Sequence, residues 1–172
     1  EGGLAVFLIQ PLGDIVAQHQ WTALRHGHHT YFSLTSLRNT LAVAGLTPIT
    51  ALRYDLYGWV AVVLATRDGQ PDDALLAAYE AEARQGLTSP AGLAGLADSV
   101  AASLRHLRDY LADRRATSTR LYAYGAASKA VAELAMAGEL SDAIHGIGDA
   151  SPNKQGRSMP GSRVPVISPE EL

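Results

Sequence analysis

The stretch Tyr-Gly-Ala-Ala-Ser-Lys at residues 124–129 decides how the second half of this 172-residue chain folds. Residues 121–124 form a short apolar run of strand character, Gly125 interrupts it, and residues 126–137 are typical of a helix. Lys129 therefore falls in a first helical turn, where backbone N–H groups lack intrahelical partners and favour an anion. The alternative is an ordinary strand-to-helix turn with a solvated lysine, because one glycine and one lysine at this spacing are not specific.

A second motif strengthens the first interpretation. It reads Asp-Ala-Ser-Pro-Asn-Lys-Gln-Gly-Arg-Ser-Met-Pro-Gly over residues 149–161, and it follows a strand candidate at residues 144–148. A further strand candidate lies at residues 164–167, so this half of the chain is predicted to be α/β with parallel strands joined by helices. Because both motifs follow strands of the same domain, we expect them to form one phosphate-binding cradle.

The first half of the chain carries a different set of elements. Residues 4–9 form a continuous apolar run, typical of a strand buried on both faces of a parallel sheet. A helix near residues 34–44, closed by Gly45, and two strand candidates at residues 48–53 and 59–66 follow. The unpaired first strand would expose an aggregation-prone edge, which predicts a homodimer or a missing N-terminal portion.

A shift in composition near Asp68 predicts a domain boundary. Residues 68–73 read as a turn and a helix N-cap, and an alanine-rich helix extends to about Arg84. A longer helix is predicted over residues 93–115, and its apolar stripe indicates packing rather than catalysis. The stripe consists of Leu93, Leu96, Val100, Leu104, Leu107 and Leu111.

Composition excludes several classes of function. The chain has 14 basic and 17 acidic residues without charge blocks, which argues against a nucleic acid or a membrane surface as the main partner. It has no cysteine, so disulfides and thiolate metal sites are excluded. No apolar run reaches membrane-spanning length and no signal-peptide pattern is present, so we predict a cytoplasmic protein.

Three of the six histidines lie within residues 26–29, after the first strand candidate and before a helix. The carboxyl end of a parallel strand is a usual place for a site, and a histidine exchanges protons near neutral pH, so a general base is predicted here. A metal site is less favoured because no aspartate or glutamate lies in residues 25–33. A loop whose rings only bond to the backbone is the other alternative.

Seven motifs occur in the order expected of one family. They are Arg-His-Gly-His-His-Thr-Tyr-Phe-Ser-Leu at 25–34, Ala-Gly-Leu at 44–46, Tyr-Gly at 57–58, Gly-Ala-Ala-Ser-Lys at 125–129, Asn-Lys-Gln-Gly-Arg at 153–157, Pro-Gly at 160–161 and Val-Pro at 164–165. Together they resemble the carboxyl part of the nucleotide-sugar C-methyltransferases, over nearly the whole chain. Members have a zinc-binding module, a central S-adenosylmethionine domain and a C-terminal Rossmann-like domain.

The resemblance implies an α/β fold in two parts. Residues 1–67 would be the end of a methyl-transfer domain, and residues 68–172 a Rossmann-like domain, in a chain truncated at both ends. It implies S-adenosylmethionine as the cofactor of a full-length parent, with most of the cofactor site outside this chain. The isolated chain is therefore expected to transfer no methyl groups.

The resemblance also implies a mechanism. In this family a base removes the proton next to a sugar ketone, and the enolate then attacks the cofactor methyl group. The family motif Tyr-x-Glu-His places its histidine on His28, which would be the base, and places its tyrosine and glutamate on Arg25 and Gly27. Arg25 would then stabilise the enolate or bind phosphate. His26 is a second candidate base, because side chains two apart on an extended loop point the same way.

The implied partner is a nucleotide-diphosphate sugar, and no metal site is expected in this chain. A non-catalytic nucleotide-sugar-binding module or subunit is the alternative function. The substrate-binding candidates are Tyr31, Ser33, Tyr57, Tyr124, Gly125, Ala126, Ser128, Lys129, Asn153, Lys154, Gly156 and Arg157.

Overall fold

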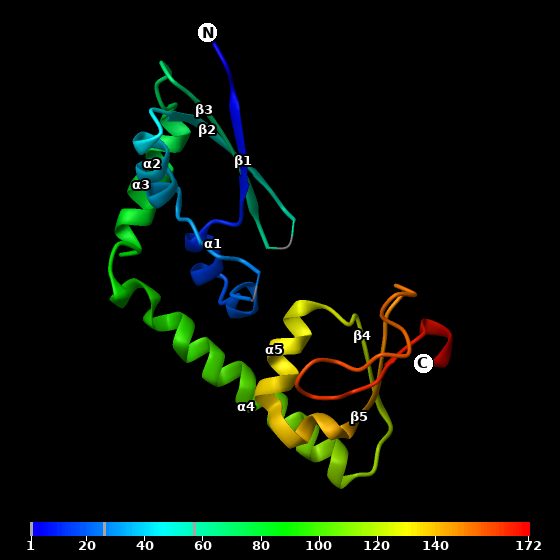
Figure 1. The fold of residues 1–172 in the computed structure, drawn as a ribbon. Helices are drawn as coiled ribbons and strands as arrows, with labels where there is room; N and C mark the ends of the chain where they lie inside the picture. Colours follow the sequence, from blue (N-terminus) through cyan, green and yellow to red (C-terminus); the bar gives the residue numbers. More distant parts are fainter. Residues whose placement is uncertain (1, 26, 57) are drawn as a thin grey trace. The chain divides into compact units, whose positions relative to one another are not determined.

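A computed structural model describes residues 2–25, 27–56 and 58–172, which form two compact units (Figure 1). The first unit comprises Glu1–Trp21 and His28–Asp98, and the second comprises Thr22–Gly27 and Ser99–Leu172. The division falls inside the long helix α4 (Ala94–Ala116). Helices and strands occur in both units, which confirms the predicted α/β class.

The first unit contains an antiparallel sheet of β1 (Ala5–Ile9), β2 (Thr47–Tyr54) and β3 (Val60–Thr66) in the order β1-β3-β2. The prediction that the first apolar run is buried on both faces of a parallel sheet is wrong. Val6 and Leu8 are 61% and 69% exposed, and β1 runs antiparallel to β3. The short turn after β2 reverses the chain, so β3 lies between β2 and β1 and is antiparallel to both.

Two helices cover one face of the antiparallel sheet (Figure 1). These are α2 (Leu34–Val43) and α3 (Asp73–Arg84), which contact each other and β2. Both agree with the predicted helices, because Gly45 follows the first and Asp72 caps the second. The alternate residues of β3 that face the helices complete this core, which is formed by Leu34, Leu37, Leu41, Ala61, Val63, Ala65, Leu75 and Tyr79.

Two side chains cap the N-terminus of helix α2. The Ser33 hydroxyl accepts a hydrogen bond from the Ser36 N–H at 3.0 Å. The buried Glu82 carboxylate of α3 accepts the N–H groups of Leu34 and Thr35 at 2.6 and 2.8 Å. A carboxylate at a helix N-terminus satisfies orphan donors and meets the positive end of the helix dipole. Glu82 therefore fixes the start of α2 to α3.

We expect Glu82→Ala to lower the free energy of unfolding by about 2 kcal/mol, because two N–H groups lose a charged acceptor. Urea unfolding followed by circular dichroism measures this. Glu80→Ala removes an exposed carboxylate from the same helix and is the matched control, with an expected change below about 0.5 kcal/mol. Equal stability of the two variants would contradict the capping role.

The second unit contains a parallel sheet of β4 (Leu121–Tyr124), β5 (Ile144–Gly148) and β6 (Val166–Ile167). Helix α5 (Ser128–Ala137) joins β4 to β5, which confirms the predicted parallel strands connected by helices. The last strand is shorter than predicted. The buried core of this unit is formed by Leu111, Ala126, Leu134, Ala137, Ala143, Ile144, Ile147, Met159, Val164 and Val166.

Short helices complete the fold. Helix α1 (Leu12–Ala17) follows β1, and the 3₁₀ helices are η1 (Trp21–Ala23), η2 (Pro90–Leu93), η3 (Gly138–Ala143) and η4 (Pro169–Glu171). Among the residues that the structure describes, no helix combines the length and apolar character that a membrane crossing requires.

Candidate functional site

Two loops meet at the carboxyl edge of the parallel sheet, as the sequence predicted. One is the turn from β4 into α5 and the other is the loop at residues 149–161 after β5. The Gly125 N–H donates to the Gly148 carbonyl oxygen at 2.7 Å, which joins the two strand ends. Gly125 has a φ of +94°, a conformation that glycine adopts without strain, so the backbone can turn sharply between β4 and α5.

Asp149 ties the two loops together. Its Oδ2 accepts the Ala126 N–H at 2.9 Å and the Lys154 ammonium at 2.9 Å, and its Oδ1 accepts the Ser151 N–H at 2.9 Å. The Gln155 amide donates to the Asp149 carbonyl oxygen at 2.9 Å. The hydrogen bond from Lys154, followed by the one from Ser151, lowers the pKa of the Asp149 carboxyl below its usual 3.8. The carboxylate therefore stays ionised and holds both loops.

Asp149 begins the second predicted motif, but the sequence did not single it out as a site residue. Its position offered a signal, because an aspartate directly after a strand and two residues before a hydrogen-bonded N–H is typical of an Asx turn. The bond to Ala126 spans 23 residues and depends on the pairing of β4 with β5, so the local pattern did not reveal it.

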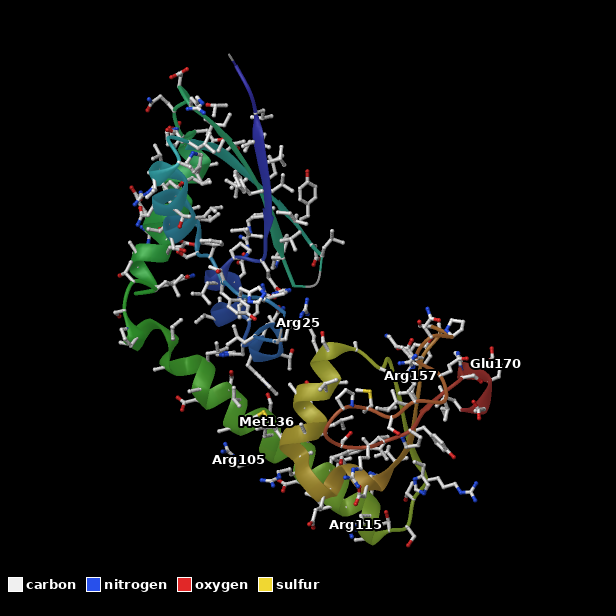
Figure 2. All side chains as sticks on the ribbon, viewed as in Figure 1. Arg25, Arg105, Arg115, Met136, Arg157 and Glu170 are labelled. Atoms are coloured by element: carbon white, nitrogen blue, oxygen red, sulfur yellow. The ribbon has the colours of Figure 1, made fainter. Side chains whose placement is uncertain are left out.

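Backbone hydrogen bonds fix the rest of the loop at residues 149–161. Gly156 N–H donates to Val166 O at 2.9 Å, and Val166 N–H donates to Arg157 O at 2.7 Å. Met159 N–H donates to Val164 O at 2.8 Å. Gly156 has a φ of +74°, so the loop turns at a glycine directly before Arg157, which is labelled in Figure 2. Arg157 thus has a defined place on the loop.

The two loops, together with α5 and β6, line an open cleft of about 360 Å³. Four residues that the sequence predicted for substrate binding line it, namely Ala126, Ser128, Lys154 and Arg157. The other lining residues were not singled out for substrate binding, although Ala127, Ser158, Met159 and Pro160 belong to the two predicted motifs. Ala127, Val131, Met159, Pro160 and Val166 give the cleft an apolar wall.

The cleft has the electrostatics of an anion site. Helix α5 begins beside it with Ala127 as N-cap and with no side chain that caps its first N–H groups. Arg157 has no acidic partner among the described residues, whereas the Lys154 ammonium is paired with Asp149. Uncapped N–H groups, a helix dipole and a guanidinium together favour a negatively charged ligand.

The remaining cradle candidates lie in β4, in α5 or in the two loops, but do not line the cleft. They are Tyr124, Gly125, Lys129, Asn153 and Gly156. Lys129 acts on Glu133 instead: burial raises the pKa of the Glu133 carboxyl, and the charge of Lys129 opposes that shift. The contribution of Lys129 to ligand binding stays a prediction.

A second cavity, of about 250 Å³, lies at the carboxyl end of β1 in the first unit. His28 and Tyr31, both predicted for the site, line it, and their ring centroids are 5.7 Å apart. The sequence did not single out the other lining residues, which are Leu8, Ile9, Gln10, Thr30 and Phe32. The cavity therefore combines a histidine with an amide, two hydroxyls and an apolar wall.

Other candidates near the histidines lie elsewhere. His26 and Tyr57 fall outside the described residues. Arg25, labelled in Figure 2, groups with the second unit and lines neither of the two cavities. Ser33 is buried and its hydroxyl caps α2. Residues 2–25, 27–56 and 58–172 contain no group of three or more histidine, cysteine, aspartate or glutamate side chains arranged to hold a metal ion.

Comparison with known proteins gives two matches. A family model described as the C-methyltransferase C-terminal domain matches residues 58–172. The C-methyltransferase NovU from Streptomyces niveus is 30% identical to this chain over 176 residues, which cover 98% of this chain and 41% of NovU. The chain thus spans less than half the length of this curated relative.

Proposed function

Because the chain belongs to the C-methyltransferase family, as the match to its C-terminal domain shows, we propose that it is the carboxyl part of a sugar C-methyltransferase. The methyl acceptor would be a keto-deoxysugar nucleotide, which reacts through an enolate. In this proposal the antiparallel sheet is the end of a methyl-transfer domain, and the parallel unit is a Rossmann-like domain that binds the nucleotide.

The cleft beside α5 is the observation that carries the proposal. A diphosphate placed there would meet the uncapped first turn of α5 and the planar guanidinium of Arg157, which suits bidentate phosphate binding. The volume of the cleft, about 360 Å³, falls within the usual range for ligand pockets. Its apolar wall offers a surface for the nucleobase or the ribose of the nucleotide.

The His28 cavity supplies the acid–base chemistry in this proposal. The C–H bond next to the sugar ketone breaks, the proton moves to the His28 imidazole, and the electron pair is delocalised onto the ketone oxygen. Tyr31, beside His28, would help to position the sugar ring. The role of His28 rests on its place in this cavity at the end of β1.

In this proposal most of the site for S-adenosylmethionine lies outside this chain. The segment after β1 reads Gln-Pro-Leu-Gly-Asp at residues 10–14, which is no glycine-rich cofactor loop. Strand β1 pairs only with β3 among the described strands, and Val6 and Leu8 are exposed. We propose that a further part of the enzyme, or a second copy of the chain, pairs with β1, and that the cofactor binds outside this chain.

A non-catalytic nucleotide-sugar-binding module is the second candidate. The observation in its favour is that Gly27 and Arg25 stand where the family motif has glutamate and tyrosine, so two polar groups of the motif are replaced. This candidate shares the cleft beside α5 but needs no proton transfer at His28. Solvent exchange of the sugar proton therefore separates the two functions.

Calorimetry with thymidine or uridine diphosphate tests the cleft in the 172-residue chain. We expect Arg157→Ala to weaken binding by about 30-fold, the usual effect of losing charge-assisted hydrogen bonds to phosphate. Lys129→Ala should weaken binding less, by about threefold, because this lysine does not line the cleft. Arg105→Ala, on the exposed surface of α4, is the matched control and should bind as the wild type does. Equal affinity of wild type and Arg157→Ala would remove the cleft from the nucleotide site.

A further inference from the structure

Arg53, near the end of β2, contacts two segments of the first unit at once. Its guanidinium forms an ion pair with the Asp14 carboxylate of α1. The Arg53 Cζ atom also lies 4.9 Å from the ring centroid of Trp59, which directly precedes β3, and this distance suits a cation–π contact. Arg53 therefore connects α1 to the turn between β2 and β3.

The Asp14 carboxylate depends on this arginine. The Asp14 side chain is 19% exposed, and together with Arg53 and Glu82 it lines a cavity of about 140 Å³. Burial raises the pKa of the Asp14 carboxyl, the charge of Arg53 opposes that shift, and the charge of Glu82 adds to it. Arg53 is the one basic residue among the described residues that line this cavity. Without it, two carboxylates would share the cavity with no cation, and we expect Asp14 to move toward water and to displace α1.

Helix α1 contacts the wall of the His28 cavity through its first residue. The Leu12 N–H donates to the Phe32 carbonyl oxygen at 2.9 Å, and Phe32 lines the cavity together with His28. Asp14 follows Leu12 by two residues in the same turn of α1, so a displacement of Asp14 also displaces this hydrogen bond. The ion pair between Asp14 and Arg53 therefore influences the wall of the cavity.

The turn on the other side of Arg53 is held in a strained conformation. Trp59 has a φ of +78°, which residues with a side chain rarely adopt. Such strain persists only where surrounding contacts enforce it, and it is frequent at functional sites. The neighbouring Gly58 carbonyl oxygen accepts the Gln18 amide, from the C-terminal end of α1, at 3.1 Å. The turn and α1 are thus joined twice, once by Arg53 and once by Gln18.

We propose that Arg53 is a positioning residue for the proton transfer at His28, because it holds α1 and with it one wall of the cavity. The inference rests on the proposed function, in which His28 takes the sugar proton. Arg53 does not line the His28 cavity, so it takes no part in the bonds that form or break. It acts on the geometry of the wall, where a displacement of about 1 Å can lower a rate by about 100-fold.

Incorporation of solvent deuterium at the sugar carbon tests the proposal in a full-length protein that contains this chain. Arg53→Leu is expected to lower kcat for incorporation by about 30-fold, with KM changed less than about threefold, because the nucleotide cleft belongs to the second unit. Arg53→Lys keeps the positive charge but loses the planar contact with Trp59, so it should lower kcat by only about fivefold. Asp14→Asn should lower kcat by about tenfold, and the double variant should lose no more than Arg53→Leu, because the ion pair is already absent.

Amide hydrogen exchange at Leu12 in the 172-residue chain tests the structural link without substrate. We expect the Leu12 amide to exchange about tenfold faster in Arg53→Leu than in the wild type, because its acceptor is no longer held in place. The amides of β3 should keep their wild-type rates, which would show that the unit as a whole stays folded.

Arg84→Leu is the matched control, since the ion pair of Arg84 with Glu80 is exposed on α3, and it should have the wild-type kcat. A wild-type kcat in Arg53→Leu, or a Leu12 amide that exchanges no faster in that variant, would show an ordinary surface ion pair and overturn the role of Arg53 alone. A wild-type protein that incorporates no deuterium would overturn the proposed function and this inference together.

Discussion

Asp149→Ala is expected to weaken nucleoside diphosphate binding by about 100-fold, because two backbone N–H groups and one ammonium lose their shared acceptor. The Ala126 N–H would lose its acceptor at the base of the first loop, and Lys154 and Ser151 would lose theirs in the second. The two loops that line the cleft would no longer be held at a fixed distance from each other. A binding site displaced by about 1 Å loses much of its affinity for a rigid anion.

A second effect of Asp149→Ala on nucleotide affinity has the opposite sign. Removal of a carboxylate also makes the cleft more positive, which by itself would strengthen the binding of a diphosphate. Asp149→Asn separates the two effects, since it removes the charge and keeps one oxygen acceptor. We expect Asp149→Asn to bind about tenfold more weakly than the wild type, because the loss of the Lys154 and Ala126 contacts at Oδ2 outweighs a screened surface interaction.

Calorimetry measures the affinity, and hydrogen exchange at the Ala126 and Ser151 amides reports whether the loops remain held. Asp142→Asn removes an exposed carboxylate from η3 and is the matched control, with no expected change. Binding by Asp149→Asn as tight as that of the wild type, or tighter, would show that Asp149 opposes the ligand rather than building its site.

The second large effect is expected at His28. In a full-length protein that contains this chain, His28→Ala should lower both methyl transfer and solvent-deuterium exchange at the sugar carbon by about 1000-fold, within the usual range for loss of a general base. Nucleotide affinity should stay within threefold of the wild type, because the cleft beside α5 belongs to the second unit. His26→Ala should have a smaller effect. Loss of exchange in His26→Ala with exchange retained in His28→Ala would assign the base to His26.

The second half of the chain was the more predictable part, for physical reasons. Gly125 ends β4 and the next residues begin α5, so strand, turn and helix each have a local signal. The antiparallel sheet was less predictable. A continuous apolar run does not state how its strand pairs, and the exposure of Val6 and Leu8 depends on neighbours that the run does not contain.

The candidate site was likewise predictable only in part. Ala126, Ser128, Lys154 and Arg157 could be predicted to share a cleft because parallel strands bring their carboxyl ends to one edge. The role of Asp149 could not be predicted in this way, although the residue begins the second motif. The bond from Ala126 to Asp149 spans 23 residues, so it depends on the pairing of β4 with β5.

The central claim is that the loops after β4 and β5 bind the nucleotide of a methyl acceptor. Residue-resolved NMR of the 172-residue chain, titrated with thymidine diphosphate and separately with uridine diphosphate, tests it most directly. We expect the amide signals of residues 126–131 and 149–160 to shift in a saturable way with at least one of these nucleotides, while those of the antiparallel sheet stay unchanged. No saturable shift with either nucleotide, or shifts confined to residues outside these loops, would contradict the claim.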